Sequence, residues 1–140
     1  MSSGDTLALV LKAKYLFIVT ALIEVGAGLT LAIVPSVAAA LLFGARINAM
    51  IEMTLARLVG GALFALGTAC WLARDDEHSH AARGVIVAML IYNLAAVAVL
   101  TYAGFGSGLV SPALWPAVAL HAALAVWCVA CLWVRPVLLS

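Results

Sequence analysis

The most constraining feature of this sequence is a long segment without charged side chains, because residues 84 to 134 contain no Lys, Arg, Asp or Glu. Of the 140 residues in the chain, 67% are hydrophobic and 9% are charged. A soluble domain of this size has too little interior to bury so many apolar side chains. The sequence therefore predicts a polytopic membrane protein whose solvent is mostly lipid.

Turn residues and charges divide the chain into four apolar segments, each close to the roughly 20 residues that cross a bilayer as a helix. Pro35 ends the first segment, because proline cannot continue the helical hydrogen bonds. The residues between Ser36 and Gly44 are too few to cross, and they predict a short helix at the membrane surface. We expect a single all-α domain, a four-helix transmembrane bundle with spans at about 15–34, 49–72, 84–102 and 114–134, an interfacial helix at 36–43 and a polar loop at 74–83.

The orientation of the bundle follows from its basic residues, since Lys and Arg that flank the spans are retained on the cytoplasmic side. Four spans place both termini and the middle loop on one face of the membrane. The opposite face carries Arg46. The sequence predicts a multi-pass protein of the cell inner membrane with both termini in the cytoplasm, on the face that carries Lys12, Lys14, Arg74, Arg83 and Arg135.

One strongly polar residue lies within each predicted span. An ionised side chain in hydrocarbon costs at least about 2.5 kcal/mol, so such residues face the bundle interior and require partners. We expect Glu24 and Arg57 to form an ion pair across two helices. Asn93 and His121 are expected to bridge or cap this ion pair. The expected buried polar cluster consists of Glu24, Arg57, Asn93 and His121.

This cluster has two interpretations. As a satisfied polar contact, it fixes the register of the helices. As a functional site, it binds a proton, an ion or a substrate, with Glu24 as the titrating group. Arg57 argues against proton transfer, because a permanent cation beside Glu24 keeps the carboxylate ionised. If Arg57 instead pairs with Glu52 or reaches the outer surface, Glu24 becomes a stronger site candidate.

Small residues on the faces of these polar residues predict where the helices approach each other closely. At helical spacing, Glu24 shares its face with Thr20 and Gly28, and His121 shares its face with Ala125 and Cys128. The corresponding row on the second span consists of Arg57, Gly60, Gly61, Phe64 and Thr68.

Three cysteines allow a thiol redox or metal role, and Cys128 and Cys131 form a C-x-x-C pair. We interpret Cys70, Cys128 and Cys131 as small buried hydrophobic residues. Tyr92 lies near the middle of the third span and is a possible contact for a quinone, sterol or lipid headgroup.

The polar loop has ligand types of a cation site, but a solvated turn is the simpler interpretation of Asp75, Asp76, Glu77, His78, Ser79 and His80. We expect no metal, no cofactor and no nucleic-acid partner. No complete catalytic motif is present, so we expect no enzymatic activity.

These observations favour a structural or accessory subunit that packs in the membrane against itself or a larger complex, with the lipid bilayer as its surroundings. A first alternative is a small homo-oligomeric transporter or channel that uses the Glu24 and Arg57 cluster. A second is a lipid- or quinone-binding protein with thiol redox chemistry.

Overall fold

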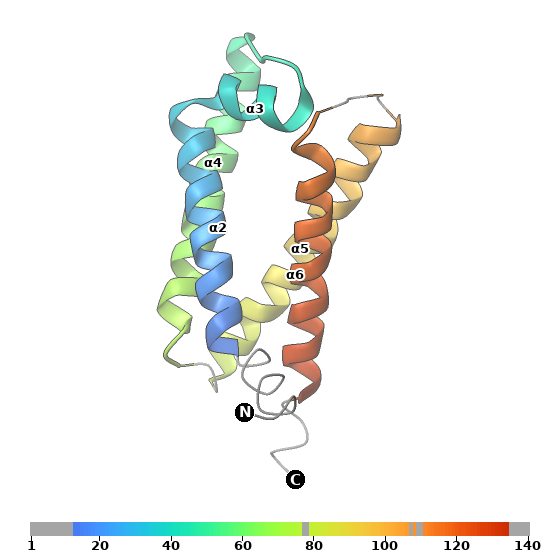
Figure 1. Cartoon of the computed structure of the whole chain (residues 1–140). Helices are drawn as coiled ribbons and strands as arrows, with labels where there is room; N and C mark the ends of the chain where they lie inside the picture. The colour runs from blue at the N-terminus through green and yellow to red at the C-terminus, as the bar shows by residue number, and fades with distance from the viewer. Residues whose placement is uncertain (1–12, 77–78, 107, 109–110, 135–140) are drawn as a thin grey trace.

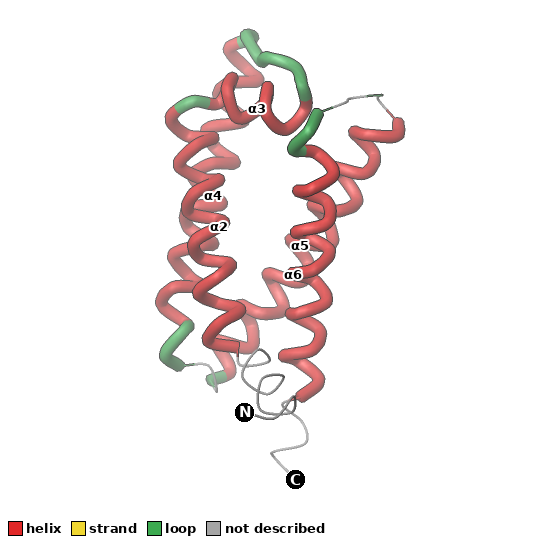
Figure 2. The backbone as a smooth tube through the Cα atoms, in the orientation of Figure 1, coloured by secondary structure: helices red, strands yellow, loops and turns green. Residues whose placement is uncertain are grey.

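The computed structural model describes residues 13–76, 79–106, 108 and 111–134. All regular secondary structure within these residues is helical (Figure 2). The helices α2, α4, α5 and α6 are long and apolar enough to cross a membrane, whereas α3 is short. The helices are α2 (Ala13–Ile33), α3 (Pro35–Phe43), α4 (Met50–Ala73), α5 (His80–Gly106) and α6 (Leu114–Val134).

These bounds confirm the predicted succession of four long apolar helices, with α3 between the first two. The main difference concerns α5, which begins at His80 rather than at residue 84. Its start is fixed by Ser79, whose Oγ accepts a hydrogen bond from the Ala82 backbone N–H at 3.0 Å, as an N-cap does. The polar loop is therefore shorter than expected, because its last residues belong to the first turn of α5.

The short helix α3 is defined by residues at both of its ends. Pro35 is its first residue, where a missing N–H costs no helical hydrogen bond. Gly44 follows its last residue with a φ of 74°, a left-handed conformation that glycine adopts without strain, and its N–H donates to the Ala40 carbonyl at 3.0 Å. Two serines attach the helix to its surroundings: Ser36 Oγ donates to the Ile47 carbonyl, and Ser111 Oγ donates to the Leu41 carbonyl.

The four long helices form two pairs, α2 with α4 and α5 with α6. The backbones of α2 and α4 approach closely at a glycine seam, which we define as Gly28, Gly60 and Gly67. A Cβ atom on Gly60 would lie 2.7 Å from both the Gly28 carbonyl oxygen and the Ala32 nitrogen. Small residues permit this approach, which is how membrane helices pack without a hydrophobic driving force.

The two pairs diverge towards the end that carries α3 and come together at the opposite end (Figure 1). A buried cluster joins them and includes Phe17 from α2, Cys70 from α4, Met89 from α5 and Leu124 from α6. Because each long helix contributes to this cluster, the core of the described residues lies between the pairs rather than within either one.

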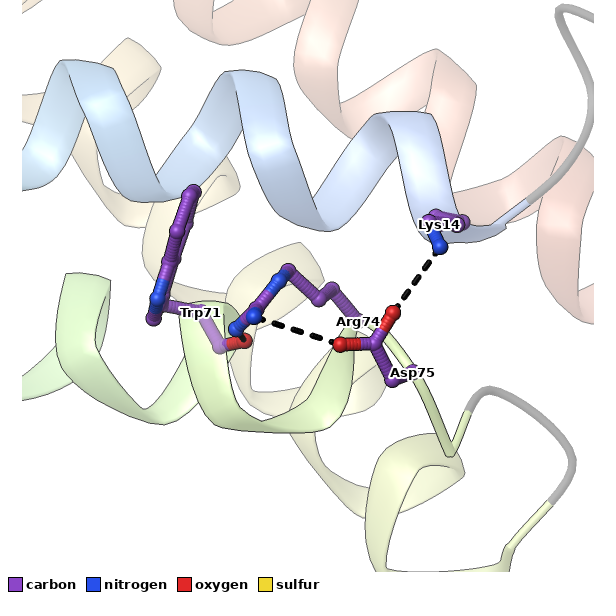
Figure 3. Close-up of polar contacts among 4 residues, drawn as sticks. All are labelled: Lys14, Trp71, Arg74 and Asp75. Carbon is purple, nitrogen blue, oxygen red and sulfur yellow. Dashed lines mark hydrogen bonds and ion pairs between the residues drawn. The ribbon is translucent and has the colours of Figure 1, made fainter.

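Charged residues connect α2 to the end of α4 outside this core (Figure 3). Lys14 Nζ lies 2.8 Å from Asp75 Oδ1, and Arg74 Nη2 lies 3.2 Å from Asp75 Oδ2. Arg74 also donates to the Trp71 carbonyl, and its guanidinium carbon lies 4.1 Å from the centre of the Trp71 ring. The hydrogen bond from Lys14 holds the pKa of the Asp75 carboxyl group below its usual value.

Candidate functional site in the bundle interior

The candidate site is centred on Glu24, near the middle of α2. Its side chain is 1% exposed, and Thr20, one turn earlier on the same face, is also 1% exposed. Together with the buried Gly28, these residues confirm the predicted inward-facing row of α2. Among the described residues, neither Glu24 Oε1 nor Thr20 Oγ1 has a hydrogen-bond partner. This row therefore places two polar oxygen atoms in the bundle interior that have no hydrogen-bond partner among the described residues.

Tyr92 brings α5 to this row. The Tyr92 hydroxyl lies close enough to the Glu24 carboxyl group to interact with it as a hydrogen-bond donor. Because Glu24 belongs to one helix pair and Tyr92 to the other, this contact crosses the boundary between the pairs. Tyr92, which the sequence indicates as a possible ligand contact, therefore lies next to the buried carboxyl group of Glu24.

Asn93 and His121 form a second polar contact, between α5 and α6. Asn93 is fully buried, and its Oδ1 lies 2.8 Å from His121 Nδ1. Asn93 Nδ2 donates to the Met89 carbonyl at 2.8 Å, which fixes the orientation of the amide. The ring of His121 packs edge-to-face against Tyr92, with ring centres 5.6 Å apart. Tyr92 thus links the Asn93 and His121 contact to Glu24.

Arg57 does not join this cluster, and the predicted ion pair with Glu24 is a point on which the structure differs from the sequence analysis. Arg57 is exposed, and among the described residues no ion pair connects it to Glu24. The reason is the orientation of α4, which buries Gly60, Leu63 and Gly67.

Of the row predicted at the helix interface, Gly60 is buried against α2, whereas Gly61, Phe64 and Thr68 are exposed with Arg57. One residue along a helix is a rotation of about 100°, so a buried face centred on Gly60 rather than on Gly61 turns Arg57 away from the interface. The long Arg side chain can extend along the helix towards polar surroundings, whereas Glu24 is too short to do so.

Two further features of the interior carry no periodic signal in the sequence. Trp127 Nε1 is buried without a hydrogen-bond partner among the described residues. Cys70, Cys128 and Cys131 are buried in the core that joins the helix pairs. Their burial agrees with the interpretation of the cysteines as small hydrophobic residues.

Ligands for a metal do not converge in the part of the chain that the structure describes, since no three His, Cys, Asp or Glu side chains there form a group that could hold an ion. In the polar loop, Asp75 pairs with Lys14 and Arg74, and His80 is exposed. Glu77 and His78 lie outside the described residues.

Comparisons of the chain with protein-family models, with curated proteins and with solved structures find no match. A buried carboxyl group without a cationic neighbour is strongly penalised when ionised, so it holds a proton or attracts a cation. Glu24 is the described group that fits this behaviour, and Tyr92 positions it.

Proposed function

We propose that this chain is a multi-pass protein of a bacterial-type inner membrane, with both termini in the cytoplasm, and that it is a small transporter in which Glu24 binds the transported proton. Four long apolar helices support insertion in a membrane. The basic residues at the Lys14 and Arg74 end, against Arg46 near α3, support this orientation.

The observation that carries the proposal is the environment of Glu24. The carboxyl group is 1% exposed, and its Oε1 has no partner among the described residues. Arg57, the cation that would have kept it ionised, lies on an exposed face of α4. A group that takes up and releases protons must be free of such a permanent partner.

The arrangement of the helices supports movement around this group. Close backbone contact at the glycine seam makes α2 and α4 one unit, while α5 and α6 form another. Glu24 and Tyr92 meet where the two units face each other. A rocking movement of one pair against the other would expose Glu24 to alternate sides of the membrane, which is the usual principle of transport by small helical units.

Proton flux in liposomes tests this proposal. The purified protein is reconstituted with the pH-sensitive dye pyranine inside the vesicles, and a potassium gradient with valinomycin sets an inward driving force for protons. We expect the wild-type protein to acidify the interior faster than protein-free vesicles do. Glu24→Gln keeps the size and polarity of the side chain but removes its proton-binding carboxyl group, so it should abolish the added flux.

Arg57→Gln is the matched control, because it also neutralises a charged residue within a predicted span but lies outside the site. It should retain the wild-type flux. A wild-type rate equal to that of protein-free vesicles would reject transport of protons, and an unchanged rate in Glu24→Gln would reject Glu24 as the carrier. Equal amounts of folded protein are established by circular dichroism of the vesicles.

A second candidate function, a structural or accessory subunit, is favoured by the exposed face of α4. Arg57 is exposed there in the first half of a long apolar helix, and a Cβ atom on Gly61 would have no heavy atom within 4 Å. A cation and a small residue on one face favour contact with another membrane helix, either from a second copy or from a larger complex.

The tagged protein is extracted from its own membrane into nanodiscs. Its native mass distinguishes contact with a second copy of the chain from contact with a larger complex. Stoichiometric companion proteins that are lost in Gly61→Trp would support the accessory function. A homo-oligomer without companions would support the transporter, and a monomer that is unchanged by Gly61→Trp would exclude the α4 face as an interface.

A further inference from the structure

An apolar pocket of about 510 Å³ lies at the end of the molecule that carries α3. Its lining comes from α2, α3, α4, the connection between α3 and α4, and the segment before α6, and includes Leu31, Leu42, Ile47, Ala56 and Ala113. Among the described residues, Thr30 is the one lining residue with a polar side chain, and its hydroxyl donates a 2.7 Å hydrogen bond to the Gly26 carbonyl. The volume lies in the range of about 300–1,000 Å³ that ligand pockets occupy.

The walls of this pocket are held in place by polar contacts outside it. Ser36 Oγ donates to the Ile47 carbonyl, which attaches the start of α3 to the segment before α4. Ser111 Oγ donates to the Leu41 carbonyl, which attaches α3 to the segment before α6. The left-handed turn at Gly44 directs the chain out of α3. The pocket is therefore formed by fixed elements rather than by loosely placed side chains.

A positive charge borders this apolar lining at the connection between α3 and α4. Arg46 lies in the connection between α3 and α4, between Phe43 and Ile47, both of which line the pocket. Arg46 is exposed, and among the described residues no ion pair involves it. A guanidinium group binds phosphate oxygens through paired hydrogen bonds.

The depth of Arg46 agrees with the position of a lipid headgroup. The α4 helix has 24 residues, so it is about 36 Å long and exceeds the roughly 30 Å of the hydrocarbon core. Arg46 precedes the first residue of α4, Met50. It therefore lies near the boundary of the hydrocarbon layer when α4 spans the membrane.

We propose that this pocket binds one acyl chain of an anionic phospholipid, with the lipid phosphate at Arg46. An apolar cavity does not hold water well, because water there finds no hydrogen-bond partners. Hydrocarbon chains surround a membrane protein at high concentration and match the lining. Free phosphate lacks the apolar part that the pocket selects, and an uncharged apolar molecule gains nothing from Arg46. This site is distinct from Glu24 and does not depend on its function in transport.

Lipid binding is measured by native mass spectrometry on delipidated protein in mild detergent. The probes are phosphatidylglycerol and phosphatidylcholine with the same acyl chains, added separately. We expect one phosphatidylglycerol to be retained for each chain, with weaker retention of phosphatidylcholine. Arg46→Gln should weaken binding of phosphatidylglycerol by about fivefold, since a basic residue near an anionic lipid surface contributes about 1 kcal/mol. It should leave phosphatidylcholine unchanged.

Ala56→Phe fills the pocket and should reduce the retention of both lipids. Arg57→Gln and Ala62→Phe are the controls, because both residues are exposed and neither lines the pocket; they should bind as the wild type does. If the wild type retained the two lipids equally, and Arg46→Gln did so too, the assignment of the lipid phosphate to Arg46 would be overturned. Full retention in Ala56→Phe would overturn the pocket itself.

A second measurement uses the wild-type protein, so its result does not depend on whether the variants fold. A phosphatidylglycerol with a photoreactive diazirine on its acyl chain is cross-linked in nanodiscs, and the modified peptides are mapped. Labels concentrated on the lining residues of α3 and α4 would support the proposal. Labels distributed evenly over all exposed apolar faces would refute it, because that pattern is expected of lipid that surrounds the protein without a site.

Discussion

The hydroxyl group of Tyr92 on α5 lies within hydrogen-bonding reach of the carboxyl group of Glu24 on α2. It is a side-chain contact between the two helix pairs, and it occurs in the interior, where alternative partners are scarce. The loss of such a bond leaves a buried polar group with one partner fewer. Tyr92 is therefore important for the stability of the assembled bundle as well as for the position of Glu24.

The first prediction concerns this contact. Tyr92→Phe removes the hydroxyl and little else, and it should lower the free energy of unfolding by about 1–3 kcal/mol, because it removes a partner of a buried carboxyl group. Unfolding is followed by circular dichroism as SDS replaces a mild detergent. Tyr102→Phe is the control, since Tyr102 is 72% exposed and its change should have little effect. Equal stability of the two variants would contradict the hydrogen bond to Glu24.

The second prediction concerns the contact between Asn93 Oδ1 and His121 Nδ1, which are 2.8 Å apart. A double-mutant cycle with Asn93→Ala and His121→Ala should give a coupling free energy of about 0.5–2 kcal/mol, the range of hydrogen bonds between membrane helices. The same SDS titration measures all four proteins. Strictly additive losses would show that the two side chains do not interact in the folded protein.

Particular residues show how far the sequence determines this arrangement. The four long helices follow from hydropathy, because any apolar segment of sufficient length must satisfy its backbone within itself in lipid. The burial of Glu24 and Asn93 follows from the same cost of exposing polar groups. The contact between Tyr92 and Glu24 does not follow, because it depends on how α5 crosses α2, and spacing along one helix carries no information on that angle.

Arg57 shows a second limit on what the sequence predicts, namely which face of α4 is buried. Its row and the buried row of α4 share the same spacing of small residues, and they differ by a rotation of about 100°. Gly60 and Gly61 are adjacent in the sequence, yet a Cβ atom on Gly60 would clash with backbone atoms of α2, while one on Gly61 would meet nothing within 4 Å. Choosing between them requires the position of α2, which a single sequence does not provide.

The third prediction concerns pH. The pKa of the Asp75 carboxyl group is lowered in the folded protein, chiefly by its hydrogen bond from Lys14. A carboxyl group with a lowered pKa stabilises the folded state above its ordinary pKa, and this contribution is lost as the pH falls through the lowered value.

Asp75→Asn should therefore reduce thermal stability near neutral pH by a small amount, and the difference from wild type should vanish in strong acid. High salt should also reduce it, because both groups of the pair are exposed. Asp76→Asn changes the neighbouring exposed carboxyl group and serves as the control in the same melting experiments. A difference that persists in strong acid would rule out the ion pair as its origin.

The fourth prediction uses the adjacent glycines of α4 as a matched pair. Gly60→Ala places a Cβ atom 2.7 Å from backbone atoms of α2, which cannot turn aside as a side chain can. We expect α2 and α4 to separate slightly, at a cost of about 1–3 kcal/mol in the free energy of unfolding.

Gly61→Ala adds the same methyl group on the exposed face of α4, where nothing lies within 4 Å. Because alanine is the better helix former, this change should be neutral or stabilise the protein by up to about 1 kcal/mol. Both variants are compared with wild type by SDS titration of the helical signal. If Gly61→Ala were the more destabilising of the two, the face of α4 that meets α2 would be the one carrying Arg57, and a direct pair between Arg57 and Glu24 would again have to be considered.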